Sequence, residues 1–239
     1  MATQKIALVT GGNKGLGLEI ARQLGQKGVT VLLGARDAVK GKGAAAKLVK
    51  EGFKVEFLQL DVENDAEIAA AVKTVESKFG KLDILINNAG VSTDWGKTPI
   101  NRESFAKTLN INTIGPWAVT QAFTGLLEKS GAGRVVNHSS ILGSIGTLKR
   151  TDQMDSFFTA AYSSSKAALD MLTVIASKAL AAKRIKVNAA HPGWVKTELG
   201  GAAAPMEVVD GAKTAVELAL IGEDGPNGGL FHLGKPLPW

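Results

Sequence analysis

The chain has 239 residues, of which 45% are hydrophobic and 21% are charged, and its formal net charge is +6 at pH 7. This composition is typical of a globular domain and excludes a disordered chain. Cysteine is absent, which excludes disulfides, thiolate metal sites and cysteine nucleophiles. The chain has three histidines and no close cluster of histidine with carboxylates, so we expect no metal site.

The positive charge is spread along the chain, and its densest group is Lys183, Arg184 and Lys186. A nucleic-acid site needs a clustered basic face with aromatic side chains for stacking, whereas aromatic residues make up only 5% here. We therefore expect surface charge and no nucleic-acid partner. No apolar run approaches about 18 residues and the first residues lack a signal-peptide pattern, so we expect no membrane partner and a cytoplasmic location.

Short apolar runs alternate with amphipathic segments along nearly the whole chain. Runs of Val, Ile and Leu without polar alternation are typical of parallel strands buried on both faces. The expected strands are Lys5–Thr10, Val29–Gly34, Lys54–Leu60, Leu82–Asn87, Arg134–His138, Ile185–Ala189 and Gly229–Leu233. The expected helices cover residues 16–27, 38–51, 65–79, 103–129, 160–182 and 206–221. This alternation predicts a single α/β domain over residues 1–239, with a Rossmann-type doubly wound parallel sheet of about seven strands and helices on both faces.

The first expected strand runs into a glycine-rich loop at residues 10–17, Thr-Gly-Gly-Asn-Lys-Gly-Leu-Gly, and then into a helix. Glycines permit a tight turn and a close approach of the backbone to a pyrophosphate, and a helix N-terminus offers free N–H groups to the anion. A position after a strand and before a helix is the context that such a loop requires. The loop therefore predicts dinucleotide binding beyond the carboxyl ends of the strands.

The end of the second strand indicates which dinucleotide is bound. An acidic residue there would accept from the 2′-hydroxyl of the adenosine ribose and repel a 2′-phosphate. The sequence instead has Ala35 followed by Arg36, whose planar guanidinium suits a phosphate. Lys14 in the glycine loop is a second cation within reach. We therefore expect NADP(H) rather than NAD(H), and we expect Asp37 to cap the next helix.

Tyr162 and Lys166 are four residues apart in an expected helix, so their side chains share one face. A phenol with a pKa near 10 is a poor acid–base group at neutral pH, and a nearby ammonium favours its ionised form. We expect the pKa of Tyr162 to lie below 10, although such a pair also occurs in purely structural helices. Ser139 and Ser140 end the fifth strand, where a substrate oxygen would lie.

Asn112 falls inside an expected helix, where Asn is unfavourable, so that a functional role or a kink near Gly115-Pro116 would explain it. Residues 87–90, Asn-Asn-Ala-Gly, end the fourth strand, and turn chemistry is the alternative reading of this motif.

Together these motifs resemble the short-chain dehydrogenase/reductase family over essentially the whole chain. The matching motifs are residues 10–17, Asp61-Val62, residues 87–90, Asn112, Ser140, Tyr162 with Lys166, and Pro192-Gly193. Residues 192–197 and 229–239 resemble the carbonyl reductases that use NADPH. The resemblance implies an oxidoreductase that transfers a hydride between NADP(H) and a small carbonyl or alcohol substrate such as a ketone, an aldehyde or a quinone.

The resemblance also implies roles for single residues. Tyr162 would be the general acid in reduction, Ser140 would donate to the carbonyl oxygen, and Lys166 would hold the nicotinamide ribose. Asn112 would support a water in the proton relay. The implied cofactor-binding residues are Gly11, Asn13, Lys14, Gly15, Leu16, Gly17, Arg36, Asp61, Val62, Asn88, Ala89, Gly90, Tyr162, Lys166, Pro192, Gly193, Val195 and Thr197.

The segment between Ser140 and Tyr162 is longer than is usual in this family, with an insert at about residues 144–160. Related carbonyl reductases with a still longer insert are often monomers, because the insert covers the helices used for dimer packing. We therefore expect a monomer rather than a homo-oligomer. The aromatic residues Phe157, Phe158, Trp95 and Trp194 could contact substrate or serve packing only.

Two other functions are compatible with parts of the sequence. A non-catalytic NADP(H)-binding sensor is the alternative, which loss of the tyrosine, lysine or serine would favour, and none is lost. An epimerase or dehydratase of the longer, extended branch has a different glycine spacing and a substrate domain for which this chain has no room. The identity of the substrate and the physiological direction stay open, since the substrate pocket consists of loops.

Overall fold

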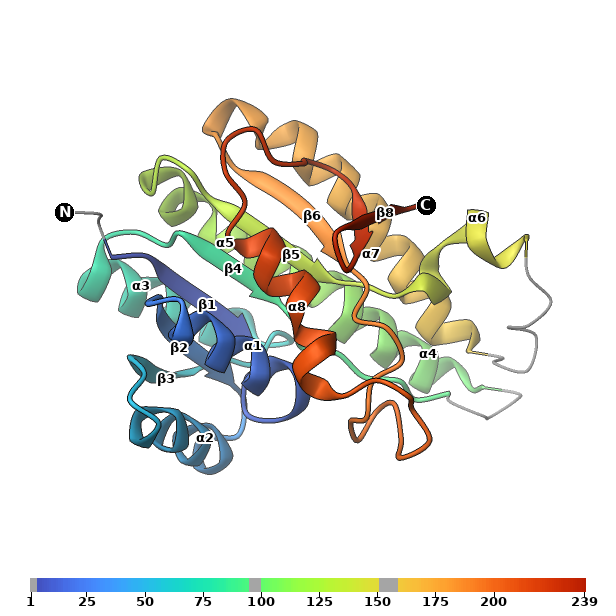
Figure 1. Ribbon diagram of the computed structural model, residues 1–239, viewed down its shortest axis with the longest axis horizontal. Coiled ribbons are helices and arrows are strands. Elements are labelled where there is room, and N and C mark those ends of the chain that lie inside the picture. The colour runs from blue at the N-terminus through green and yellow to red at the C-terminus, as the bar shows by residue number, and fades with distance from the viewer. Residues whose placement is uncertain (1–3, 95–99, 151–158) are drawn as a thin grey trace.

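A sheet of eight strands runs through the centre of the computed structural model, which describes residues 4–94, 100–150 and 159–239 (Figure 1). The strands are β1 Ile6–Thr10, β2 Thr30–Ala35, β3 Val55–Gln59, β4 Ile84–Asn87, β5 Arg134–His138, β6 Lys186–Ala190, β7 Leu230–His232 and β8 Lys235–Leu237. Their order across the sheet is β3-β2-β1-β4-β5-β6-β7-β8, and β1 to β7 pair in parallel. The predicted doubly wound α/β fold is confirmed.

The eighth strand is one more than the sequence predicted. β8 pairs antiparallel with β7, with Phe231 opposite Pro236. A proline has no N–H to donate and is tolerated only at a sheet edge or a bulge. The short run of β8 also lacks the apolar pattern of a buried strand, so its pairing depends on the neighbouring β7 and not on its own sequence.

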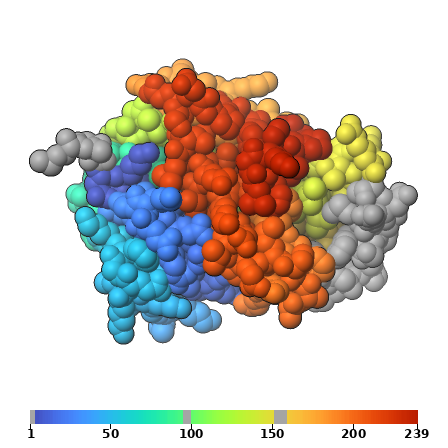
Figure 2. Space-filling model, viewed as in Figure 1, coloured from blue at the N-terminus to red at the C-terminus, as the bar shows by residue number. Residues whose placement is uncertain are grey.

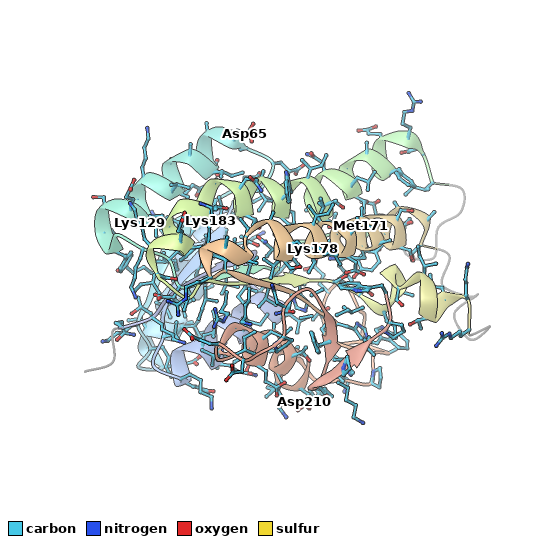
Figure 3. All side chains as sticks on the ribbon, turned by 90° about the horizontal axis from the view of Figure 1, so that it is seen from above. Asp65, Lys129, Met171, Lys178, Lys183 and Asp210 are labelled. Atoms are coloured by element: carbon cyan, nitrogen blue, oxygen red, sulfur yellow. The ribbon has the colours of Figure 1, made fainter. Side chains whose placement is uncertain are left out.

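Helices cover both faces of the sheet (Figures 1 and 3). The helices are α1 Gly15–Gln26, α2 Ala38–Lys50, α3 Asp65–Phe79, α4 Arg102–Leu109, α5 Gly115–Lys129, α6 Ile145–Leu148, α7 Ala160–Ala179 and α8 Val208–Ala219. One core cluster joins α1, α2 and α8 to one face, and a second joins α3, α5 and α7 to the other. None of the helices in the described ranges is long and apolar enough to cross a membrane.

The central strands β1, β2 and β4 are largely apolar because both of their faces are covered. Within β2, Val31 and Leu33 belong to the first core cluster, whereas Leu32 between them belongs to the second. All three side chains are at most 2% exposed. The absence of polar alternation in the sequence thus reflects burial on both sides of a parallel sheet.

The helix expected at residues 103–129 is interrupted. A π-helical turn, Asn110–Ile114, separates α4 from α5. Pro116 occupies the first turn of α5 and has no N–H for a bond to the preceding turn. The single regular helix expected over residues 103–129 was therefore wrong, and the irregularity is the π-helical turn that holds Asn112 and ends just before Gly115-Pro116.

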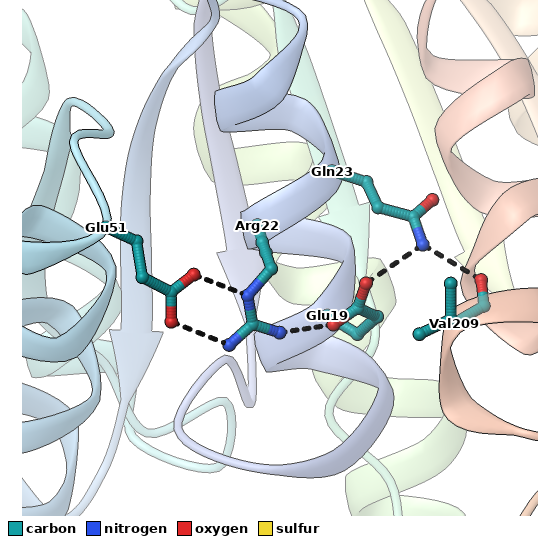
Figure 4. A network of polar contacts seen from close by, with 5 residues as sticks. All are labelled: Glu19, Arg22, Gln23, Glu51 and Val209. Carbon is teal, nitrogen blue, oxygen red and sulfur yellow. Dashed lines mark hydrogen bonds and ion pairs between the residues drawn. The ribbon is translucent and has the colours of Figure 1, made fainter.

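A chain of polar contacts fixes α1 between α2 and α8 (Figure 4). The Arg22 guanidinium donates from Nε and Nη2 to the Glu51 carboxylate at 2.6 and 3.1 Å, and from Nη1 to Glu19. The Gln23 amide donates to Glu19 at 3.0 Å and to the Val209 carbonyl at 2.8 Å. The space-filling view shows α1 directly against α8 (Figure 2). These contacts orient the helix whose N-terminus follows the glycine loop.

Candidate active site

A cavity of about 800 Å³ opens at the carboxyl ends of the parallel strands. It is lined by segments that follow β1, β2, β3, β4, β5 and β6, and by the first turns of α7. The chain reverses its direction of winding between β1 and β4, and such a switch point is where doubly wound sheets bind ligands. The predicted location of the site is therefore where the cavity lies.

The glycine loop lies against the segment after β4 with no room for larger side chains. Gly11 has φ +62°, and a Cβ there would meet the Cα of Ala89 at 2.9 Å. A Cβ on Gly17 would meet the carbonyl oxygen of Gly11 and the amide of Asn88, both at 2.4 Å. Glycine is thus required at both positions, which leaves the backbone N–H groups and the N-terminus of α1 accessible from the cavity.

Asn88 and Thr10 hold the glycine loop in place. The Asn88 amide nitrogen donates to the Thr10 carbonyl at 2.9 Å and to the Gly11 carbonyl at 3.2 Å. The Thr10 hydroxyl accepts from the backbone N–H groups of Asn88 and Ala89, both at 3.0 Å. His138 completes the set, because its Nδ1 donates to the Asn88 amide oxygen at 2.9 Å. Nothing in the sequence indicated that Thr10 and His138 support the loop.

The end of the cavity that follows β2 and β3 carries exposed cations. Lys14 and Arg36 both line it, together with Asp61 and Val62. Ala35 is 2% exposed, and no acidic side chain stands at that position. Lys14 forms an ion pair with Glu198 from the loop after β6, which the sequence did not indicate.

Asp37 caps α2, as predicted, by accepting from the backbone N–H of Lys40 at 3.0 Å.

The loop after β6 closes the other side of the cavity. Pro192, Gly193, Val195 and Thr197 line it, as does Trp194. The Thr197 hydroxyl accepts from the Gly200 N–H at 3.0 Å and the Trp194 indole donates to the Gly200 carbonyl at 2.7 Å, which fixes the loop's turn. Trp194 therefore reaches the cavity, while Trp95, Phe157 and Phe158 lie outside the described residues.

Tyr162, Lys166 and Ser140 meet at the inner end of the cavity. Tyr162 and Lys166 lie in the first two turns of α7, and Ser140 is the second residue after β5. The Lys166 ammonium donates to the His138 carbonyl at 2.6 Å and is 5.5 Å from the centroid of the Tyr162 ring. All three side chains are at most 9% exposed.

The pKa values at this end are governed by burial. Burial raises the pKa of Tyr162 to about 12, against the lowering effect of the Ser140 hydroxyl, and Asp170 raises it further. Burial also lowers the pKa of Lys166 to about 8. The expectation that the pKa of Tyr162 lies below 10 was therefore wrong for the chain without cofactor. Burial, and not the neighbouring ammonium, therefore sets the direction of the shift.

Asn112 lies beside the cavity in the π-helical turn and is not among the residues that line it. Its amide exchanges two hydrogen bonds of 2.8 Å with the backbone of Val91, and its nitrogen also donates to the Ser165 hydroxyl at 3.0 Å. The side chain thus ties the segment after β4 to α7. Its role toward a water stays a prediction.

Every predicted cofactor-binding residue lines this one cavity, and so does Ser140. A dinucleotide fits the donor set, because one end offers backbone N–H groups and two cations and the other offers hydroxyls and an ammonium. No group of three His, Asp or Glu side chains in the described ranges could hold a metal ion.

The fold and the cavity define a nucleotide-binding α/β enzyme. The family model described as short chain dehydrogenase matches residues 5–207, and the chain belongs to this family. It is 35% identical to (-)-isopiperitenone reductase of Mentha piperita, covering 98% of each chain. It is 32% identical to salutaridine reductase of Papaver bracteatum, covering 95% of this chain and 94% of that one. The crystal structure of the NADPH-bound carbonyl reductase from chicken fatty liver has a TM-score of 0.87 at 30% identity, covering 99% of both chains.

Proposed function

We propose that this protein is an NADPH-dependent reductase of small carbonyl compounds. One observation carries the proposal: a single cavity joins the buried Tyr162, Lys166 and Ser140 at one end to Lys14 and Arg36 at the other. The names of the relatives, reductases of isopiperitenone and salutaridine and a carbonyl reductase with bound NADPH, support the same reaction class.

NADPH, when bound, supplies a hydride to the carbonyl carbon of the substrate. Ser140 and Tyr162 donate hydrogen bonds to the carbonyl oxygen, and Tyr162 transfers its proton to that oxygen as it becomes an alcohol. A raised pKa keeps the phenol protonated at neutral pH, which is the form needed for reduction. Lys166 holds the nicotinamide ribose and stabilises the phenolate until the phenol regains a proton from solvent. The same groups run in reverse for alcohol oxidation.

The test of the reaction is a panel of ketones, aldehydes and quinones assayed by NADPH oxidation. We expect turnover by the wild type, and a loss of at least about a hundredfold for Tyr162→Phe with NADPH affinity retained, since general acid catalysis contributes that much. Ser140→Ala should lose far more activity than its neighbour Ser139→Ala. NADPH binding without turnover of any carbonyl would favour the sensor function instead.

The preference for NADPH over NADH follows from Lys14 and Arg36. A charge-assisted hydrogen bond to phosphate corresponds to about a ten- to a hundredfold difference in affinity. Arg36→Ala should therefore weaken NADPH binding and leave NADH binding unchanged. Lys47→Ala, which removes an exposed cation of α2 outside the cavity, is the matched control. Equal affinity of the wild type for both cofactors at low salt would contradict this preference.

We also propose that the enzyme acts as a monomer in the cytoplasm without a nucleic-acid partner. The insert at about residues 144–160 supports the monomer, and the scattered basic residues support the lack of a nucleic-acid partner. Met171 of α7, labelled in Figure 3, is 61% exposed, so α7 is the surface through which two copies of the chain would associate if the protein is not a monomer. Light scattering that gives a stable dimer or tetramer would overturn the monomer.

A further inference from the structure

Asp170 is a buried carboxylate that the reaction described above does not use. It lies one helical turn beyond Lys166 on α7 and is 4% exposed, close to the 5% of Lys166. Neither of its oxygens has a hydrogen-bond partner of normal geometry in the described part of the chain, and the same holds for the buried hydroxyl of Ser139 beside it. Buried polar groups without partners are rare, so this carboxylate needs an explanation.

A purely structural carboxylate in this protein is held differently. Asp83, at the start of β4, is 8% exposed and accepts from the Ile6 N–H at 2.8 Å and the Lys81 ammonium at 2.9 Å. Asp170 has no such backbone contact. Burial raises the pKa of Asp170 to about 7, against the lowering effects of the Ser139 hydroxyl and the Lys166 ammonium, which both favour its ionised form.

The ionisable groups around this pair come from three elements. On α7 itself they are Tyr162 and Lys166, from β5 it is His138, and after β6 it is His191. Lys166 and His191 both act on His138. Burial, Lys166 and His191 lower the pKa of His138 to about 3, so His138 carries no charge at neutral pH. Burial also keeps His191 neutral, with a pKa lowered to about 4. Asp170 is therefore the group in this set whose negative charge can compensate Lys166, and it carries that charge above about pH 7.

We propose that Asp170 is a positioning residue, the buried counter-ion that keeps Lys166 charged and available to the cofactor ribose. The inference rests on the proposed function of Lys166. A lone buried ammonium tends to lose its proton, whereas a carboxylate one turn away on the same helix face stabilises the charged form. One of the three ammonium donors is engaged by the His138 carbonyl, which leaves two donors for ribose hydroxyls.

The Asp170 carboxylate also favours carbonyl reduction, through its effect on the Tyr162 phenol. Asp170 raises the pKa of the phenol as well as that of Lys166. It therefore favours the protonated phenol and the protonated lysine together, and both forms are required to reduce a carbonyl. Ser139, next to the substrate-binding Ser140, would then hold the carboxylate in place from the end of β5.

The pH dependence of NADPH binding tests the proposal. Dissociation constants are measured by cofactor fluorescence between pH 6 and pH 10 for the wild type, Asp170→Asn and Asp83→Asn. We expect wild-type affinity to fall as pH rises past about 8, where Lys166 loses its proton. In Asp170→Asn the fall should come at least about one pH unit lower. Asp83→Asn, which removes a buried carboxylate at the other end of β4, should follow the wild type. An unchanged midpoint in folded Asp170→Asn would overturn the inference.

A reciprocal measurement covers the case in which Asp170→Asn does not fold. Carboxyl ¹³C resonances report the titration of Asp170 in the wild type and in Lys166→Met. If the two groups are coupled, loss of the ammonium must raise the pKa of Asp170. An equal pKa in both proteins would overturn the inference. Carbonyl reduction by Tyr162→Phe at the wild-type rate would instead overturn the proposed function, so the two failures are distinguishable.

Discussion

Tyr162 is the only tyrosine in the chain, so tyrosinate absorbance during a pH titration reports this phenol alone. In the protein without cofactor, burial raises its pKa from 10.0 to about 12. At pH 8 the phenolate is then about one molecule in 10,000, compared with about one in 100 for an ordinary tyrosine. The shift of about 2 units corresponds to about 3 kcal/mol of preference for the neutral phenol.

The same shift links ionisation of the phenol to stability. The unfolded chain loses the tyrosine proton near pH 10 and the folded chain retains it to about 12, so stability falls as pH rises through this window. The titration must therefore be followed together with circular dichroism, and only points from folded protein count. Tyr162→Phe supplies the baseline.

Oxidised cofactor should lower the pKa of Tyr162 by at least about one unit, because its nicotinamide ring brings a positive charge close to the phenol. Reduced cofactor, whose ring is neutral, should lower it less. A pKa at or below 10 in the folded protein without cofactor would refute the dominance of burial. A pKa indifferent to oxidised cofactor would remove the phenol from the reacting centre.

Three further outcomes are expected. Glu198→Gln frees Lys14 from its ion pair and should tighten NADPH binding by about two- to fivefold, with NADH binding unchanged in the same fluorescence titration. Gly17→Ala should abolish cofactor binding or folding, whereas Gly125→Ala, exposed in α5 with open space around it, should raise stability by about 0.5–1 kcal/mol in thermal unfolding. Burial lowers the pKa of His138 to about 3, so the folded protein loses stability as pH falls from about 6.5 toward 3. His138→Gln should flatten this part of the acid-unfolding curve. An acid-unfolding curve identical to that of the wild type would contradict the burial of a neutral imidazole.

The sequence predicts those parts of the site that depend on local spacing. The glycine loop stands directly between a strand and a helix, and Tyr162 and Lys166 share a helix face, so each is visible within a few residues. The strands of a parallel sheet are visible for the same reason, since burial on both faces leaves unbroken apolar runs. The carboxyl ends of parallel strands also meet at one edge of the sheet, so motifs far apart in the sequence could be placed in one cavity.

What the sequence could not predict depends on partners far away in the chain. Glu198 contacts Lys14 across the cavity from a loop 184 residues later, and β8 exists only through its pairing with β7. The pKa of Tyr162 was mispredicted because spacing shows its neighbour Lys166 but not the depth at which both are buried. The role of Asp170 could not be predicted either, because an aspartate on a helix is usually exposed and the sequence does not show that this one is buried.

The charged groups at one end of the cavity are exposed and those at the other end are buried. This difference separates selection of the cofactor from the chemistry of reduction. Lys14 and Arg36 are exposed, so the proposed attraction of a 2′-phosphate to them would be screened by salt. Lys166 and Tyr162 are buried, where screening is weak and protonation depends on burial and on neighbouring charges. A change in ionic strength should therefore alter the choice between NADPH and NADH and leave the pH dependence of turnover in place. We therefore propose that the cavity discriminates cofactors by a salt-sensitive attraction, and that it reduces substrates with proton donors that the sheet and α7 shield from solvent.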